Sequence, residues 1–319
     1  MPNGNYDEAW IAAAKTLATR NLKGLTIRCP SCGESGTVMS KWIPKSPVKP
    51  LYVVHSNGNG YFKCCLLDAD ESSVARAGVK VIARDTIKTL RLGKPFVLFS
   101  GGRDSLCTLE YMRRLGKRAG VEITAVHADT TAGLPEVEEY VRTTCASMNV
   151  RLITVRPPRD FFRLAKSWGI PGVKSRWCCK TLKIAPIRRY LSQIKGPKVI
   201  YDGIRAAESP VRAKYVPVWF HPSFRCLSVS PIFNWSDGEV DGYIKSKDLP
   251  PNPTAGLGIS GECWCGAYMC RSDFEALLNM RPDVFNKLVQ VEKAQRGKYT
   301  FLYEDGKQVR LSTLKAKPS

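Results

Sequence analysis

From residue 95 onward, short apolar segments alternate with longer amphipathic ones. PFVLFS, VEITAVHA, VRLITVRP and PKVIYDG have the composition of buried strands, whereas SLCTLEYMRRLG, LPEVEEYVRTTCASM and TLKIAPIRRYLSQI have helical spacing. Strands that alternate with helices form parallel sheets covered on both faces. The sequence therefore predicts an α/β fold, a parallel twisted sheet flanked by helices. We expect Gly116 to close the first of these helices and Pro186 to kink the third.

The rest of the chain suggests smaller parts around this domain. An amphipathic pattern over residues 6–22 predicts a helix, and LYVVHSNGNGYFKC predicts a hairpin with Asn57 and Gly58 at its turn. The predicted parts are an N-terminal helix, a small zinc-ribbon-like β module, a helical connector, the α/β domain, and a Cys-rich loop with C-terminal helices and a loose basic tail, over residues 1–22, 23–68, 69–94, 95–250 and 251–319.

The charge of the chain favours a polyanionic partner. Its 319 residues include 49 Lys and Arg against 28 Asp and Glu, a formal charge of +21. This excess fits nucleic acid or a phosphorylated ligand, and the alternative is a generally basic proteome. No apolar run is long enough to span a bilayer, and MPNGNYDEAW lacks the layout of a signal peptide. We therefore expect a cytoplasmic protein without a membrane partner.

SGGRDS, residues 100–105, lies between the first predicted strand and the first predicted helix. Helix N-termini attract phosphate through free N–H groups and the helix dipole, and glycines allow close backbone approach. This feature predicts a phosphate-binding loop formed by Ser100, Gly101, Gly102, Arg103, Asp104 and Ser105. Asp104 is a candidate Mg²⁺ ligand or helix cap. The alternative is an ordinary strand-to-helix turn.

SGGRDS resembles the pyrophosphate loop of the N-type ATP pyrophosphatases, the adenine nucleotide alpha hydrolases. HADTTAGLPEVEEYV, RWCCKTLKIAPIRRYL, DGIRAAESPVRA and SPIFNWSDGEVDGYI are similar to further motifs of one branch, the phosphoadenosine phosphosulfate (PAPS) reductase-like proteins. The resemblance covers roughly residues 95–275. It implies an adenine nucleotide ligand, either ATP or PAPS/adenylyl sulfate, with Mg²⁺.

Two further segments are expected to complete the nucleotide site. Asp129 and Thr130 follow the second predicted strand, where open α/β sheets bind ligands, and the resemblance makes them the adenosine contact. A turn with Gly203 leads to two arginines that could close over phosphate or sulfate, with Glu208 holding one of them. The candidate catalytic residues are Asp104, Arg103, Arg205 and Arg212. The alternatives are a helix cap at Asp129 and an incidental surface ion pair at the second segment.

The N-terminal cysteines predict a structural zinc ion. Cys29-Pro-Ser-Cys32 has the spacing of a zinc knuckle, which supplies two thiolates. The other two ligands are expected among His55, Cys64 and Cys65, although the hairpin lacks a regular CxxC. In the alternative, the adjacent cysteine pair belongs to the core and the knuckle binds nothing.

A second group of cysteines lies in RWCCKTLK and GECWCGAYMC. The resemblance implies a [4Fe–4S] cluster held by a vicinal pair and a distant pair, which requires four thiolates. The chain has five candidates: Cys178, Cys179, Cys263, Cys265 and Cys270. We expect one of the vicinal pair to combine with the three distant cysteines. Zinc in the same site and metal-free cysteines are the alternatives.

The leading hypothesis is an ATP-using enzyme that adenylates an acceptor for sulfur transfer. Family members that thiolate RNA or phosphorothioate DNA share this logic, so tRNA or DNA is the expected acceptor, with a sulfur or electron donor protein. PAPS and adenylyl-sulfate reductases use a cysteine near the C-terminus, and no cysteine follows Cys270 here. One alternative is therefore a sulfonucleotide reductase with a non-standard nucleophile. Another is a non-catalytic module that binds nucleotide or nucleic acid.

Overall fold

The computed structural model describes residues 26–28, 35–40, 51–57, 60–67, 86–90, 92–173, 175–215, 217–221, 223–255 and 263–316. The chain divides into two compact units, which are described separately. The first unit comprises Met1–Val97, Glu110–Ile123 and Lys195–Glu239, and the second comprises Leu98–Leu109, Thr124–Ile194 and Val240–Ser319. None of the helices in the described ranges combines the length and apolar character that crossing a membrane requires.

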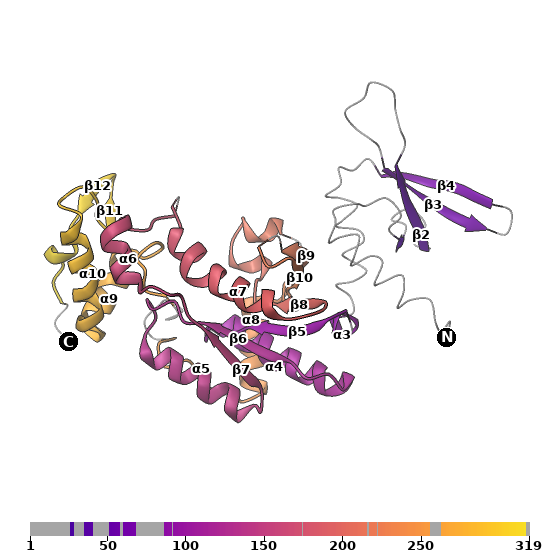
Figure 1. Cartoon of the computed structure of the whole chain (residues 1–319), viewed down its shortest axis with the longest axis horizontal. Helices are drawn as coiled ribbons and strands as arrows, with labels where there is room; N and C mark the ends of the chain where they lie inside the picture. Colours follow the sequence, from indigo (N-terminus) through magenta and orange to yellow (C-terminus); the bar gives the residue numbers. More distant parts are fainter. Residues whose placement is uncertain are drawn as a thin grey trace, which may run out of the picture. The chain divides into compact units, whose positions relative to one another are not determined.

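A six-stranded sheet has the strand order β7-β6-β5-β8-β10-β9, as drawn in Figure 1. Its strands are β5 (Lys94–Leu98), β6 (Thr124–Ala128), β7 (Arg151–Val155), β8 (Lys198–Tyr201), β9 (Val218–His221) and β10 (Cys226–Val229). β5 pairs with β8, β8 with β10, and β6 with β7, all parallel, whereas β9 and β10 are antiparallel. The expected parallel sheet flanked by helices is confirmed. The antiparallel edge strand β9 was not expected.

The N-terminal part of the first unit contains an antiparallel sheet. Its strands β1 (Thr26–Arg28), β2 (Ser35–Ser40), β3 (Leu51–Asn57) and β4 (Gly60–Leu67) are adjacent in chain order. The predicted hairpin is present, because β3 and β4 pair antiparallel from Asn57 and Gly60 onward. His55 is buried on β3, and Cys64 and Cys65 lie on β4. Cys29, Cys32 and the predicted helix 6–22 lie outside the described residues, so the zinc site stays a prediction.

Outside that sheet, the first unit has little regular helix. The helical connector predicted over 69–94 is described only from residue 86, where α3 (Thr86–Thr89) precedes β5. Two short 3₁₀ turns follow β8, η2 (Ala206–Glu208) and η3 (Arg212–Lys214). The core of this unit includes Val97, Ile200 and Tyr201, which are fully buried on neighbouring strands. This packing fixes the carboxyl end of β8, after which the segment with Arg205 and Arg212 begins.

The second unit supplies most of the helices. They are the first half of α4 (Arg103–Ala119), α5 (Pro135–Ser147), α6 (Phe161–Trp168), the π-helical turn η1 (Cys179–Ile184), α7 (Ala185–Gln193), most of α8 (Asp237–Ser246), α9 (Arg271–Met280) and α10 (Pro282–Ala294). α5 packs on β7, α7 packs on β6 and β7, and α6 packs on α10. The π-helical turn η1 lies where a kink was expected. Proline lacks the backbone N–H that an α-helix needs, and the wider turn before Pro186 accommodates its ring.

Two expectations were wrong, one about the end of α4 and one about the C-terminal segment. α4 continues past Gly116 and ends at Ala119. Gly116 is instead a point of close approach, because a Cβ there would lie 2.5 Å from the carbonyl oxygen of Val121, where the chain returns after the helix. The C-terminal segment is not a loose tail throughout. It forms the hairpin β11 (Leu302–Glu304) and β12 (Lys307–Val309) and the turn η5 (Leu311–Thr313). The buried Glu292 carboxylate on α10 fastens this segment, since it accepts from the Leu311 N–H at 2.9 Å.

Candidate functional site

The glycine-rich loop of the second unit joins the end of β5 to the start of α4. Ser100 and Ser105 hold it closed, since their hydroxyl oxygens lie 3.0 Å apart and the Ser105 hydroxyl donates to the Gly102 carbonyl at 2.9 Å. α4 begins at Arg103, so the first N–H groups of the helix, which have no intrahelical acceptor, face this loop. The loop thus has the geometry of an anion-binding helix N-terminus.

Gly101 is required in this loop for two reasons. Its φ of 87° lies in the left-handed region that favours glycine. A Cβ on it would lie 3.0 Å from Val137 Cγ1 and 3.1 Å from Val141 Cγ2, both on α5. Its carbonyl is held by the Asn252 side-chain amide, which donates at 2.7 Å. Backbone conformation, packing and hydrogen bonding therefore all specify the path of the loop at this residue.

The charged residues of the loop lie in the first turn of α4. The Arg103 guanidinium donates to Asp104 at 3.2 Å and to Asp241 on α8 at 3.1 Å. Arg103 therefore stands beside two carboxylates rather than alone over the loop. Asp104 is largely shielded, with a side chain 19% exposed. Its backbone carbonyl accepts from the Thr108 hydroxyl at 3.0 Å, which fixes the start of the helix.

A tight turn follows β6 and places Asp129 and Thr130. The Asp129 carboxylate accepts from the Thr131 N–H at 2.8 Å and pairs with Arg156 at 2.7 Å. Thr131 adopts a positive φ of 59°, and its hydroxyl accepts from the N–H of Phe161, the first residue of α6, at 2.8 Å. The turn is therefore fixed at the carboxyl end of β6, where open α/β sheets bind ligands.

Four cysteines and Thr130 line one cavity of about 360 Å³. Cys178 and Cys179 enter it from the start of η1, and Cys263 and Cys265 enter it from the loop before α9. The sulfurs of Cys178 and Cys265 lie 3.7 Å apart. The Trp264 backbone N–H donates to the Ala132 carbonyl at 2.6 Å, which joins the second cysteine segment to the turn that carries Asp129 and Thr130.

The thiols perturb one another. Hydrogen bonding between Cys178 and Cys179 raises the pKa of Cys178 to about 12 and lowers the pKa of Cys179. Contact with Cys178 raises the pKa of Cys265 to about 11. Cys178, Cys179 and Cys265 thus titrate as one coupled group. Because metal ligation requires thiolates, a metal bound here would release protons, and its affinity would rise with pH.

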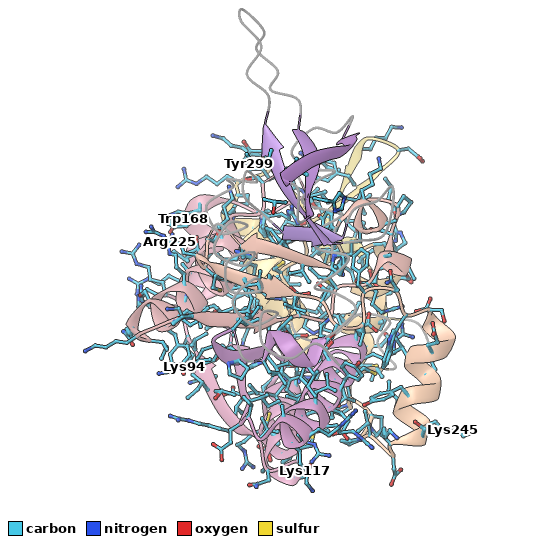
Figure 2. The ribbon with its side chains drawn as sticks, turned by 90° about the vertical axis from the view of Figure 1, so that its right-hand side faces the viewer. Lys94, Lys117, Trp168, Arg225, Lys245 and Tyr299 are labelled. Carbon is cyan, nitrogen blue, oxygen red and sulfur yellow. The ribbon has the colours of Figure 1, made fainter. Side chains whose placement is uncertain are left out.

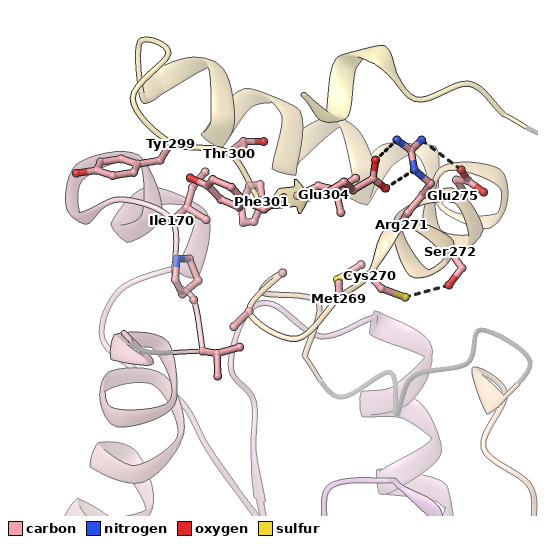
Figure 3. Close-up of a pocket in the computed structure, with 17 residues that line it drawn as sticks. Ile170, Met269, Cys270, Arg271, Ser272, Glu275, Tyr299, Thr300, Phe301 and Glu304 are labelled. Atoms are coloured by element: carbon pink, nitrogen blue, oxygen red, sulfur yellow. Dashed lines mark hydrogen bonds and ion pairs between the residues drawn. The ribbon is translucent and has the colours of Figure 1, made fainter. Parts of the chain in front are cut away.

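Cys270 does not join these thiols, contrary to the expected ligand set. It caps the N-terminus of α9, and its exposed thiol contacts the Ser272 hydroxyl at 3.0 Å (Figure 3). It lines a larger cavity of about 880 Å³, where Arg271 pairs bidentately with Glu304 at 2.5 and 2.7 Å. The two cavities share Gly266, Ala267 and Met269 in their walls. The chain folds back at the positive-φ Gly266, which directs Cys265 and Cys270 to different cavities.

In the first unit, the segment after β8 places Arg205, Glu208 and Arg212 differently from the sequence expectation. Arg205 is 2% exposed, and its guanidinium donates to the Trp235 carbonyl at 3.1 Å and to Asp237 at 2.8 Å. These contacts anchor the start of α8, so Arg205 does not project as a mobile phosphate clamp. Glu208 accepts from the Arg205 N–H at 2.8 Å and pairs with Arg212. Arg212 is the exposed guanidinium of the two.

Asp202, just before Gly203, is a site residue that sequence reasoning missed. It is partly buried, and it accepts hydrogen bonds from the hydroxyls of Ser228 at 2.9 Å and Ser230 at 2.6 Å and from the Ile204 N–H at 3.2 Å. Burial raises its pKa, although these hydrogen bonds and Arg212 act against the rise. An acid directly after a buried strand is the sequence signal that could have found it. The network fixes the turn that carries Gly203.

The pKa of Asp202 leads to a prediction about stability. Because the folded carboxyl holds its proton to higher pH than the unfolded one, the free energy of unfolding should fall as pH rises above about 4. The slope should be at most about 1.4 kcal/mol per pH unit until the folded group ionises. In urea unfolding between pH 4 and 7, Asp202→Asn should flatten this slope, and Asp248→Asn at an exposed position should leave it unchanged. An identical slope in Asp202→Asn would show that another group causes it.

Comparisons with known proteins agree with the motifs of this site. Residues 94–262 match the phosphoadenosine phosphosulfate reductase domain. An uncharacterised protein of Methanocaldococcus jannaschii is 29% identical over 184 residues, 56% of this chain and 37% of that protein. The adenosine 5'-phosphosulfate reductase of Mycobacterium tuberculosis is 32% identical over 142 residues, 43% of this chain and 52% of that enzyme.

Among solved structures, the PAPS reductase of Candida auris in its phosphate complex aligns with a TM-score of 0.45 and 17% identity, over 57% of this chain and 91% of that one. The chain spans about a third to a half of the two curated relatives described above. The domain match itself, at residues 94–262 of 319, covers more than half of the chain. The chain therefore belongs to the phosphoadenosine phosphosulfate reductase domain family.

Proposed function

We propose that the protein is an adenine-nucleotide-binding enzyme that uses ATP to activate an acceptor for sulfur transfer. The observation that carries the proposal is the loop of residues 100–105. It combines a positive-φ glycine, two paired serine hydroxyls and the N-terminus of a 17-residue helix. Together these features favour the phosphate chain of a nucleotide over an uncharged ligand.

Each part of the site has its own role in this reaction. The turn at Asp129 and Thr130 holds the adenosine, and the loop amides and Ser105 hold the phosphates. Asp104 is the ligand for Mg²⁺, and the N-terminus of α4 offsets the charge that develops on the leaving group. An acceptor oxygen attacks the α-phosphorus, the bond to the β-phosphate breaks, and pyrophosphate leaves. Hydrosulfide then displaces AMP from the acceptor, which exchanges oxygen for sulfur without a change in oxidation state.

The four-thiol cavity fits a [4Fe–4S] cluster. Cys178, Cys179, Cys263 and Cys265 supply the four thiols that such a cluster requires. The Trp264 indole N–H is fully buried and has no acceptor among the described residues, so a sulfide near the flanking thiols would satisfy it. When bound, the cluster would supply electrons or an iron site for sulfur.

The experiment is nucleotide binding by the anaerobically purified protein, followed by isotope exchange between ATP and pyrophosphate. We expect saturable ATP binding, and about 10-fold weaker binding in Ser105→Ala because a hydroxyl that holds the loop is lost. Ser192→Ala, at an exposed serine on α7, is the matched control and should bind ATP normally. Absence of ATP binding by the cluster-loaded protein would rule out the proposal.

A second candidate function is reduction of a sulfonucleotide, and the position of Cys270 favours it. Its exposed thiol lines a cavity that shares a wall with the four-thiol cavity. In this reaction the thiolate attacks sulfur, the bond from sulfur to the phosphate oxygen breaks, and AMP leaves. A thiol reductant then releases sulfite. Sulfite formation from adenosine 5'-phosphosulfate that disappears in Cys270→Ser would favour this function over the ATP-dependent one.

A further inference from the structure

A long stretch of the second unit is exclusively basic. Residues 161–194 contain eight Lys and Arg and no Asp or Glu. The composition of the whole chain, with 28 acids in 319 residues, would place about three acids in a stretch of this length. The segment includes α6, η1 and α7 and carries two of the cavity cysteines, Cys178 and Cys179. The basic excess of the chain is therefore concentrated beside the four-thiol cavity.

Three cations of this stretch are exposed and have no carboxylate partner among the described residues. Arg163 and Lys166 on α6 and Arg176 before η1 are all exposed, and none of them pairs with a carboxylate of the described residues. In contrast, Glu275 and Glu304, the acids that line the larger cavity, both pair with Arg271. Unpaired cations in one region create a positive field that attracts a polyanion.

Exposed aromatic side chains lie among these cations. Trp168 is 53% exposed and Tyr268 is 62% exposed. The rings of Trp168 and Trp177 contact each other edge to face, with their centroids 5.4 Å apart. Trp177 in turn stacks on Phe161 at a centroid distance of 5.9 Å, which holds the Trp177 ring in place. The Arg176 guanidinium donates to the Tyr268 hydroxyl at 2.6 Å. The ring contacts connect Trp168 on α6 with Trp177, which is next to Arg176 in the chain, and Arg163 and Lys166 lie on the same helix as Trp168. We call Arg163, Lys166, Trp168, Arg176 and Tyr268 the basic–aromatic surface.

The basic–aromatic surface leads to both cavities. Tyr268 lines the four-thiol cavity. The loop after α6, from Ile170 to Val173, lines the larger cavity together with Tyr299, which is 55% exposed. Figure 2 labels Trp168 and Tyr299, whose side chains lie at the molecular surface. An extended ligand on this surface would therefore reach a cavity of about 880 Å³ next to the thiols, large enough for a nucleobase.

We propose that the basic–aromatic surface binds an unpaired nucleic-acid strand and directs one of its nucleotides to the cavities beside the thiols. Exposed aromatic faces stack with unpaired bases, and the cations contact the phosphates. A duplex offers no free base faces, and an acidic polypeptide has none, so the aromatic component selects a single strand. The inference rests on the proposed function, since it names the acceptor that the activated nucleotide would modify.

The test is fluorescence anisotropy with a labelled 20-nucleotide single strand, as DNA and as RNA, in the absence of ATP. Arg163→Glu with Lys166→Glu should weaken binding at least 10-fold and reduce the salt slope by about 1.4, since each single-strand phosphate contact contributes about 0.7. Trp168→Ala should weaken binding about 5- to 100-fold, and Trp168→Phe should restore most of it. Lys117→Glu with Arg118→Glu, at the far end of α4, is the matched charge control and should retain most of the binding.

The outcomes separate the surface from the enzyme reaction. Strand binding without ATP binding would refute the proposed function and keep the surface assignment, whereas ATP binding without strand binding would refute the surface alone. Equal affinity for duplex, or for polyglutamate, would overturn the choice of an unpaired strand. The same loss of binding in the charge control as in the α6 variant would also overturn it. Preference between the DNA and RNA probes would identify the sugar of the acceptor.

Discussion

Replacing Cys265 with serine is expected to remove the proposed iron–sulfur cluster almost completely. Anaerobically reconstituted wild-type protein should hold about four iron atoms per chain. It should also show the broad visible absorbance of an iron–sulfur cluster. Cys265 is buried at the wall of the four-thiol cavity, with its sulfur 3.7 Å from that of Cys178. Serine oxygen is a poor ligand for this site, so iron should fall to nearly zero in the variant.

The matched control is Cys145→Ser, because Cys145 is a buried thiol on α5 that lines neither cavity. It should retain its iron. Cys270→Ser should also retain it, since Cys270 lines the other cavity. Circular dichroism of each apo-protein separates loss of the cluster from loss of the fold. Full iron content in Cys265→Ser, or its loss in Cys270→Ser, would contradict the assigned ligand set.

The second large effect is expected at Gly101. Alanine there must adopt a φ of 87°, which costs about 1–2 kcal/mol, and its Cβ would press on Val137 and Val141. The loop can relieve both only by moving its amides away from the phosphate position. We expect at least a 50-fold loss of ATP affinity by calorimetry, since several charge-assisted hydrogen bonds depend on these amides.

Gly120→Ala provides a matched control for backbone strain. Gly120 also has a positive φ, 66°, but a Cβ there meets nothing within 4 Å. Both variants should lower the free energy of unfolding by a similar strain term, while only Gly101→Ala loses ATP binding. Comparable ATP affinity in the two variants would mean that nucleotide does not approach the loop at Gly101.

The strands of the central sheet could be predicted from the sequence where a short apolar segment is also buried. β5, β6, β7 and β8 are short apolar segments that the alternation with helices identifies, and the loop before α4 follows from the same pattern. The antiparallel strand β9 was missed because pairing with β10 is set by tertiary contacts rather than by periodicity. Gly116 was misread as a helix end because glycine serves both as a terminator and as a point of close approach.

The side-chain constellation was less predictable than the fold. Sequence spacing could not tell which four of the five cysteines line the same cavity, since Cys265 and Cys270 are separated by a turn at Gly266. The burial of Arg205 depends on Trp235 and Asp237, some 30 residues away, so its type alone suggested a ligand contact. Asp202 required knowledge of its two serine partners on and beside β10. Long-range contacts of this kind have no local signal.

The most direct test of the central claim is a crystal structure of the cluster-loaded protein with a non-hydrolysable ATP analogue and Mg²⁺. The account predicts that the triphosphate lies against the backbone amides of Gly101 and Gly102 and the hydroxyls of Ser100 and Ser105, with the adenosine at the turn of Asp129 and Thr130. Density for the analogue at another location, with this loop empty at saturating ligand, would contradict it.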